Sequence, residues 1–183
     1  MNFESATWMI DTRPYRVLLY YNYVPLADPK AARDEMEAFC MAEQLLGRIL
    51  IAPEGLNGTV SGTWEATQRY MDWMAEHPLF HATEFKIDEA EGHAFLKMHV
   101  RVRNEIVHLG VEDLDMTVEV DNYVEPEEWR EIMKSNDPDI VILDARSNYE
   151  HEVGKFKGAL TLDIDNFREL PEKLAELEAY KDK

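Results

Sequence analysis

The sequence predicts an α+β protein in two parts, a sandwich of an antiparallel sheet with two helices and a smaller α/β unit. Up to about residue 110, strand-like runs rich in β-branched and aromatic residues alternate with helical runs, which predicts the sandwich. Beyond about residue 124, a continuous apolar run stands between helical segments, as in a buried strand of a parallel sheet. We therefore expect domains at 1–110 and 124–183, joined by an acidic linker at 111–123.

The first strand is expected over Tyr15–Val24, and a helix should follow it with Asp28 as the N-cap residue. The apolar stripe of this helix continues to about Leu46, where Gly47 would end it. The remaining segments of the first part are, in order, a strand over 48–52, a turn over 53–58, a strand over 59–61, a helix over 64–76 and extended chain over 84–87 and 94–109. This order, with its additional strand, is typical of a ferredoxin-like sandwich.

In the second part, one helix is expected to begin at Pro126 and another at Pro171. Between them, the apolar run Asp139–Leu143 predicts a strand that is buried on both faces. Only one further short strand is suggested, near Ala159–Leu162, although each parallel neighbour needs its own crossover connection. The faces and edges of Ile140–Leu143 would then stay open, so we expect this sequence to break off inside an α/β domain.

The net charge of -18 argues against a protein that coats nucleic acid, because such proteins are basic, although a local basic groove stays open. No stretch approaches the roughly 20 apolar residues of a membrane span, and no signal peptide is recognised at the start. The single cysteine, Cys40, excludes an internal disulfide, so we expect a cytoplasmic protein. Cys40 falls in mid-helix, where a core position is expected, and His77 and His81 straddle Pro78 without metal-ligand spacing.

A strictly alternating segment between residues 96 and 103 is the clearest candidate for a binding surface. With a period of two, one face of a strand would carry Leu96, Met98, Val100 and Val102 into the core, and the other would carry Lys97, His99, Arg101 and Arg103. Side chains on one face of a strand lie about 6 to 7 Å apart, close to the phosphate spacing of one nucleic-acid strand. Such a cationic row in an acidic chain is interpreted either as an RNA-binding face or as a solvated strand face.

Two further groups of residues are weaker candidates. The glycine-rich segment Glu54–Gly62, with Asn57 as an RNA-binding candidate, could let the backbone approach a phosphate or could be a tight connection between strands. Asp144 lies at the carboxyl end of the predicted buried strand, where open α/β sheets place functional groups. For Asp144, Arg146 and Glu150 we favour a structural ion-pair and capping network.

Several motifs, in order along nearly the whole chain, resemble the rhodanese-type tRNA uridine hydroxylases. The segments that carry the resemblance are Tyr15–Tyr23, Gly47–Gly62, Lys97–Gly110, Tyr123–Trp129, Ile140–Ala159 and Phe167–Pro171. They include the string Glu-Gly-Leu-Asn-Gly-Thr-Val-Ser-Gly at 54–62, and an Asp-x-Arg followed by Gly-x-x-x-Gly-Ala within 140–159.

The resemblance implies a ferredoxin-like (acylphosphatase-like) RNA-binding domain, followed by a rhodanese-like domain of which 124–183 is the first part. Members of that family install a hydroxyl group on C5 of the wobble uridine of certain tRNAs, dependent on oxygen. The implied partner is a tRNA anticodon stem-loop, with neither DNA nor a membrane expected, and the resemblance identifies no cofactor. It also implies a catalytic cysteine in a loop beyond Lys183, so we expect none in this chain.

Two other functions stay open. A sulfurtransferase would carry a persulfide on the same cysteine, and a non-catalytic fragment would only bind RNA. The cationic strand favours the hydroxylase and the RNA-binding fragment over the sulfurtransferase. A rhodanese that acts on small sulfur donors has no need of an added domain with a basic face.

Overall fold

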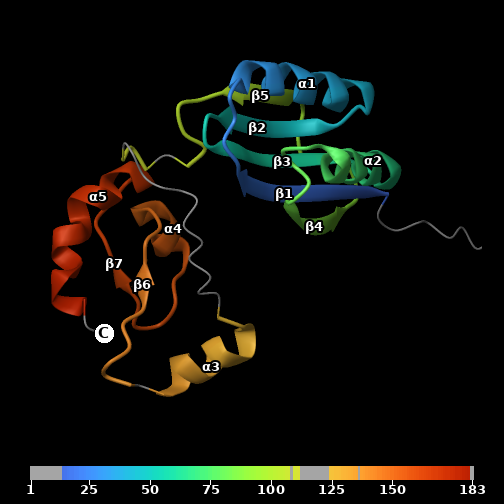
Figure 1. Cartoon of the computed structure of the whole chain (residues 1–183). Helices are drawn as coiled ribbons and strands as arrows, with labels where there is room; N and C mark the ends of the chain where they lie inside the picture. The colour runs from blue at the N-terminus through green and yellow to red at the C-terminus, as the bar shows by residue number, and fades with distance from the viewer. Residues whose placement is uncertain (1–13, 108, 112–123, 136, 182–183) are drawn as a thin grey trace, which may run out of the picture. The chain divides into compact units, whose positions relative to one another are not determined.

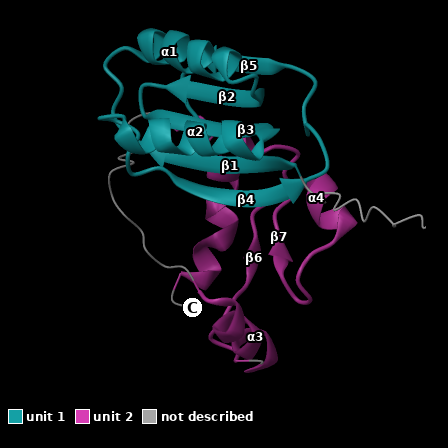
Figure 2. Cartoon of the chain, turned by 90° about the vertical axis from the view of Figure 1, so that its right-hand side faces the viewer, with its two compact units in different colours: residues 1–107 teal, residues 108–183 magenta. Residues whose placement is uncertain are grey.

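A computed structural model of the chain describes residues 14–107, 109–111, 124–135 and 137–181. The chain divides into two compact units, unit 1 up to Val107 and unit 2 from His108 (Figure 2). The predicted acidic linker at 111–123 lies outside the described residues except for Val111. Across the described ranges, the helices are too short or too polar for any of them to cross a membrane.

Unit 1 is a five-stranded sheet with two helices. Its elements are β1 (Tyr15–Tyr23), α1 (Pro29–Ala42), β2 (Leu46–Ala52), β3 (Gly55–Thr63), α2 (Trp64–Glu76), β4 (Glu84–Ala90) and β5 (Met98–Val102). The strand order is β4-β1-β3-β2-β5, in which β5 runs parallel to β2 and the other neighbours are antiparallel (Figure 1). This topology confirms the ferredoxin-like sandwich with one additional strand.

The core of unit 1 lies between the helices and one face of the sheet. Tyr20 on β1 and Tyr70 on α2 meet there through their hydroxyl oxygens, which lie 2.5 Å apart, and the Tyr70 hydroxyl also donates to Sδ of Met36 on α1 at 3.0 Å. Cys40 of α1 is fully buried in the same cluster, and burial raises the pKa of its thiol to about 12. The prediction of a core cysteine is confirmed.

Helix α1 ends at Ala42, so the prediction that it reaches Leu46 and stops at Gly47 is wrong. Leu45 is buried and donates its backbone N–H to the carbonyl of Cys40, which closes the helix, and Leu46 already begins β2. Gly47 lies inside that strand, where a Cβ atom would collide with the carbonyl oxygen of Thr59 on the neighbouring strand. Glycine at this position therefore permits a close approach of two strands rather than the end of a helix.

The Asn57-Gly58 pair lies inside β3, so the prediction of a turn there is also wrong. The chain reverses before this pair, at Pro53-Glu54, which forms the turn between β2 and β3. Gly58 faces the core, and a Cβ atom there would overlap the ring of Tyr20. An Asn-Gly pair favours a tight turn by local preference, but here the position beneath a large aromatic ring in a central strand requires the glycine.

Unit 2 contains short elements and a small sheet. They are α3 (Pro126–Ser135), β6 (Leu143–Asp144), α4 (Asn148–Val153), β7 (Leu160–Thr161) and a helical stretch made of η1 (Phe167–Glu169), α5 (Leu170–Lys173) and η2 (Leu174–Tyr180). Strands β6 and β7 pair in parallel.

Of the predicted strand Asp139–Leu143, only Leu143 belongs to a strand, β6. The prediction that this run is buried on both faces is wrong. Ile140 is 42% exposed and Leu143 is 38% exposed, because β7 is the only strand that pairs with β6 among the described residues. The expectation that this run would keep open faces and edges is confirmed.

Candidate nucleic-acid interface

Strand β5 carries the predicted alternation in its central part. Val100 is 6% exposed and Met98 packs against the core, whereas His99 and Arg101 are exposed on the other face. The alternation does not hold at either end, since Leu96 is 96% exposed and Val102 is 40% exposed. Both were predicted to be buried, but Leu96 precedes the strand and Val102 ends an edge strand, so the core does not reach them.

The pairing of the strands extends the cationic row sideways across the sheet. Arg48 on β2 lies between His99 on β5 and Thr59 on β3 in the strand register. One step along the strands, Leu50 lies between Arg101 and Asn57. These residues all lie on the face of the sheet that the helices do not cover, which is called the open face from here on. Sequence reasoning missed Arg48, although its alternation with the buried Ile49 is the signal that could have found it.

The connection from β4 to β5, the crossover segment 91–97, crosses part of the open face. It has to cross the sheet because β4 and β5 are its two opposite edges. Ser61 on the central strand β3 accepts the backbone N–H of Ala94 through Oγ at 3.1 Å and lies 3.3 Å from Nδ1 of His93. Ser61 is therefore fully buried although it points away from the core.

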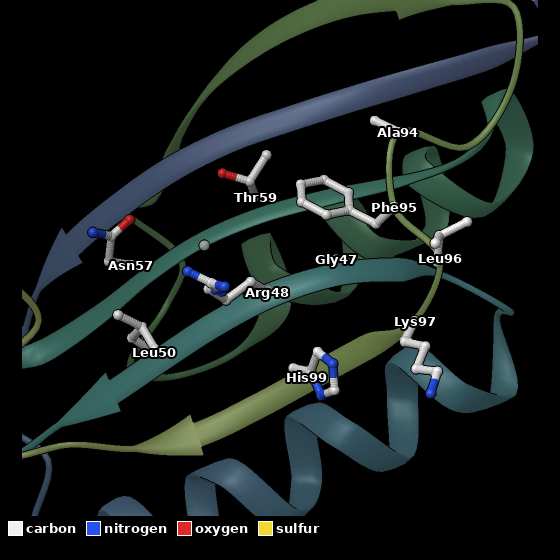
Figure 3. A pocket seen from close by; sticks show the side chains of 11 residues that line it. Gly47, Arg48, Leu50, Asn57, Thr59, Ala94, Phe95, Leu96, Lys97 and His99 are labelled. Carbon is white, nitrogen blue, oxygen red and sulfur yellow. The ribbon is translucent and has the colours of Figure 1, made fainter. Parts of the chain in front are cut away.

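A cavity of about 800 Å³ lies on the open face beside the crossover segment (Figure 3). Arg48 and Leu50 of β2 line it together with Asn57 and Thr59 of β3. The crossover segment and the start of β5 add Ala94, Phe95, Leu96, Lys97 and His99. Figure 3 shows the ring of Phe95 over the sheet near Thr59, with the side chain of Arg48 rising from β2 below it.

The cavity is basic in an acidic chain. Among the described residues that line it, Arg48, Lys97 and His99 carry basic side chains and none is acidic. Neither Arg48, Lys97 nor Arg101 forms a salt bridge with another described residue. Anionic groups of a ligand would therefore meet cations that are not already neutralised by a carboxylate of the described chain.

Asn57 and Arg103, two predicted RNA-binding residues, lie near one end of the open face. The Asn57 amide donates to the carbonyl of Ile106 at 3.3 Å, and Glu54 accepts the Ile106 N–H at 2.6 Å. The two side chains thus hold the segment that follows β5, and Ile106 is buried. Arg103 is exposed beyond β5 and its guanidinium donates to the carbonyl of Val102 at 3.1 Å.

The other predicted group, Asp144, Arg146 and Glu150, lies in unit 2. Arg146 donates to both carboxylate oxygens of Asp144, at 2.9 and 2.8 Å, and to the carbonyl of Gly154 at 2.7 Å. Hydrogen bonding from Arg146 lowers the pKa of Asp144 to about 2. Glu150 accepts from the backbone and hydroxyl of Ser147 at the start of α4. These bonds have the geometry of an ion pair and a helix cap, and the structural role of the three residues stays a prediction.

Comparison with known proteins gives a family for unit 1. Residues 15–106 match the family described as "UPF0176 acylphosphatase like domain". This range covers all five strands and both helices of unit 1. Among solved structures, "BlrB - a BLUF protein, dark state structure" aligns with 54% of this chain and 80% of its own, at 20% identity and a TM-score of 0.45, a likeness too low to inform function.

Curated relatives extend over both units. The "tRNA uridine(34) hydroxylase" of Cytophaga hutchinsonii is 52% identical over 171 residues, which are 93% of this chain and 54% of that protein. The protein of the same name from Bacillus pumilus is 54% identical over 161 residues, which are 87% of this chain and 49% of that protein. The chain thus spans about half the length of the curated relatives that it matches.

Proposed function

This chain belongs to the UPF0176 family, and we propose on that premise that it is part of an oxygen-dependent tRNA uridine(34) hydroxylase whose RNA-binding part is unit 1. Relatives that are 52% and 54% identical are named tRNA uridine(34) hydroxylase, which supports hydroxylation of the wobble uridine and favours it over sulfur transfer. The position of the new hydroxyl group, C5, is proposed from the resemblance of the sequence motifs. The partner in this proposal is the tRNA anticodon stem-loop. The protein would act in the cytoplasm, which contains tRNA and keeps a lone thiol reduced.

One observation carries the assignment of RNA binding to unit 1. In a chain with a net charge of -18, the open face gathers Arg48, Lys97, His99 and Arg101 around a cavity whose described lining residues include no acid. Backbone phosphates are the ligands that such a row fits, because charge neutralisation releases counterions and needs no base-specific contact. The anticodon loop is single-stranded, so little duplex needs to open before it can lie along the sheet.

No catalytic residue is assigned to the described chain. Cys40 is the only thiol, but it lies in the core on the helix-covered face with a raised pKa, so it is a poor nucleophile. In this proposal unit 1 holds the RNA, and Asp144, Arg146 and Glu150 brace the turn before α4. The hydroxylation itself would need groups other than these.

A salt titration tests the RNA-binding proposal. The affinity of the full chain for an anticodon stem-loop RNA is measured by fluorescence anisotropy between low and moderate salt, for the wild type and for Arg101→Gln/Arg103→Gln. Each phosphate contact on a single strand contributes about 0.7 to the slope of log affinity against log salt, so the double variant should lose about 1.4 units. The loss should be similar for different loop sequences, because phosphate contacts position the RNA without reading it.

A charge-matched control is available on the helix-covered side. Arg33 and Arg69 each form salt bridges with nearby carboxylates, so Arg33→Gln/Arg69→Gln removes the same charge away from the open face. This control should keep the slope of the wild type. Equal slopes for the Arg101→Gln/Arg103→Gln variant and the wild type would refute the open face as a phosphate-binding surface.

A further inference from the structure

We propose that the open-face cavity binds one unpaired base of the RNA, stacked against Phe95 and Arg48, with the adjoining phosphates on Lys97 and His99. This inference deepens the proposed function and rests on it, since it names what unit 1 recognises in addition to the phosphate backbone. It assigns a base-binding role to residues of the crossover segment and of β2.

The cavity has the size of a binding site, and hydrogen bonds to the sheet hold the segment that forms one of its walls. Its volume of about 800 Å³ falls within the roughly 300–1,000 Å³ of typical small-molecule sites, so a nucleotide fits. The crossover segment is fixed on both sides of Phe95, by the Ala94 N–H on Ser61 at 3.1 Å and by the Gly47 N–H on the carbonyl of Lys97 at 3.1 Å. Phe95 is thus held over the sheet before any ligand arrives, which reduces the entropy lost on binding.

The lining supplies the groups that recognise an unpaired base. An aromatic ring and a guanidinium plane are the two side-chain types on which splayed-out RNA bases stack, and Phe95 and Arg48 bring one of each to this cavity. Leu50 provides an apolar floor, and the Thr59 hydroxyl can donate to or accept from a base edge. Lys97 and His99 at the rim carry N–H groups that can donate to a phosphate, so both the base and the backbone of one nucleotide have complementary groups.

The same lining argues against catalysis in the cavity. The described residues around it include neither a carboxylate nor a thiol, and its histidine, His99, is an exposed residue of the rim. The base held here is therefore a bound base of the loop and not one that undergoes chemistry in this cavity. A base anchored at this point would add a contact that belongs to one position of the loop, whereas phosphate contacts do not distinguish one nucleotide from the next.

The test separates stacking from phosphate binding. The full chain and its Phe95→Ala and Phe95→Tyr variants are titrated with an anticodon stem-loop RNA and with copies that carry one abasic site at each loop position in turn. Phe95→Ala should weaken binding about 5- to 140-fold, the range that base–aromatic stacking contributes, and should leave the salt slope unchanged. Phe95→Tyr keeps the ring and should retain wild-type affinity. Leu79→Ala, an exposed apolar residue outside the cavity, is the matched control.

The abasic series identifies the base. For the wild type, one abasic position should reduce the affinity by a factor similar to that of Phe95→Ala, and the same position should have little further effect in Phe95→Ala. Equal binding of Phe95→Ala and the wild type would overturn the proposal. So would a Phe95→Ala loss that is the same for every abasic RNA, since this would mean that the ring acts on the fold or on the backbone.

A second measurement distinguishes failure of the base-binding proposal from failure of the proposed RNA binding by unit 1. Amide chemical shifts of the full chain are followed by nuclear magnetic resonance during a titration with tetrauridylate. Shifts centred on Gly47, Thr59 and Phe95 support the base site. Shifts along β5 alone would leave RNA binding in place and overturn the cavity proposal, whereas no shift in unit 1 would overturn both.

Discussion

The two units bury the same kind of residue to very different extents. Ile49 and Ile51 on β2 are fully buried, whereas Ile140, which shortly precedes β6 in the sequence, is 42% exposed. Strand β2 has β3 on one side, β5 on the other and α1 above it, but β6 pairs with β7 alone among the described strands. An apolar run is therefore buried only when enough neighbouring elements surround it, whatever its own hydrophobicity.

The units also differ in what holds them together. In unit 1 an apolar cluster from five strands and two helices closes around the Tyr20–Tyr70 pair. In unit 2 the described residues that are buried are Ala159, Leu162 and Ile164. Side-chain hydrogen bonds, such as those from the Asn148 amide to Asp163 and Asp165, connect its loops. We expect the free energy of unfolding of unit 1 to be sensitive to truncation of its buried residues and insensitive to truncation of a half-exposed apolar residue in unit 2.

The largest effect should come from a cavity in the core of unit 1. Ile49→Ala removes a fully buried side chain and should lower the free energy of unfolding by about 2–5 kcal/mol. Leu143→Ala, at a position that is 38% exposed, should leave the unfolding of unit 1 unchanged. Urea denaturation followed by circular dichroism measures both, and similar losses for the two variants would break the comparison.

A smaller effect is expected from the buried hydroxyl pair. Tyr70→Phe leaves the Tyr20 hydroxyl without its 2.5 Å partner in the core, which should cost about 1–3 kcal/mol. The double variant Tyr20→Phe/Tyr70→Phe removes both polar groups and should recover part of the loss, a non-additive result expected for residues in contact. Strictly additive free energies from the same urea assay would show that the two hydroxyls do not depend on each other.

A third, smaller effect tests where along β5 the core ends. Val100→Ala should cost about 1–2 kcal/mol, because Val100 is only 6% exposed. Val102→Ala, at 40% exposure, should cost less than about 0.5 kcal/mol. Thermal unfolding of the two variants compares them directly, and a larger loss for Val102→Ala would mean that the edge of the sheet is covered in solution.

The smallest effect concerns the ion pair in unit 2. Hydrogen bonding from Arg146 holds the pKa of Asp144 near 2, below its value of about 3.9 in an unfolded chain. The pair therefore stabilises unit 2 fully above about pH 4, and this stabilisation is lost as the pH falls through the folded pKa near 2. Arg146→Gln should raise the Asp144 pKa toward 4, as measured by carboxyl carbon chemical shifts, and an unchanged pKa would remove Arg146 as the cause.

Local patterns predicted the elements of unit 1 well where a strong chemical signal marks them. Asp28 caps α1 as expected, because its carboxylate accepts the backbone N–H groups of Lys30 and Ala31. The glycines were misjudged, because Gly47 and Gly58 are required by atoms of other strands. A contact between segments far apart in the sequence leaves no local signal that distinguishes it from a turn.

The candidate interface was predicted in part for the same reason. The alternation from Lys97 to Arg101 is local, so it could be seen in the sequence, whereas Arg48 and Phe95 come from a separate strand and from the connection before β5. Only the parallel pairing of β2 with β5 brings Arg48 beside His99, and only the crossover segment 91–97 brings Phe95 to the same cavity as Thr59.

By itself, the sequence determined the order of the elements in unit 1, the N-cap of α1, the core position of Cys40 and the basic side of one strand. These features depend on residues within about a turn or a strand of one another, where periodicity and capping act. The tertiary structure alone decided which strands became neighbours, where the connection between the edge strands lies and how far each apolar run is buried. Such features depend on contacts across the sheet, because burial is a property of the surroundings of a residue and not of the residue itself.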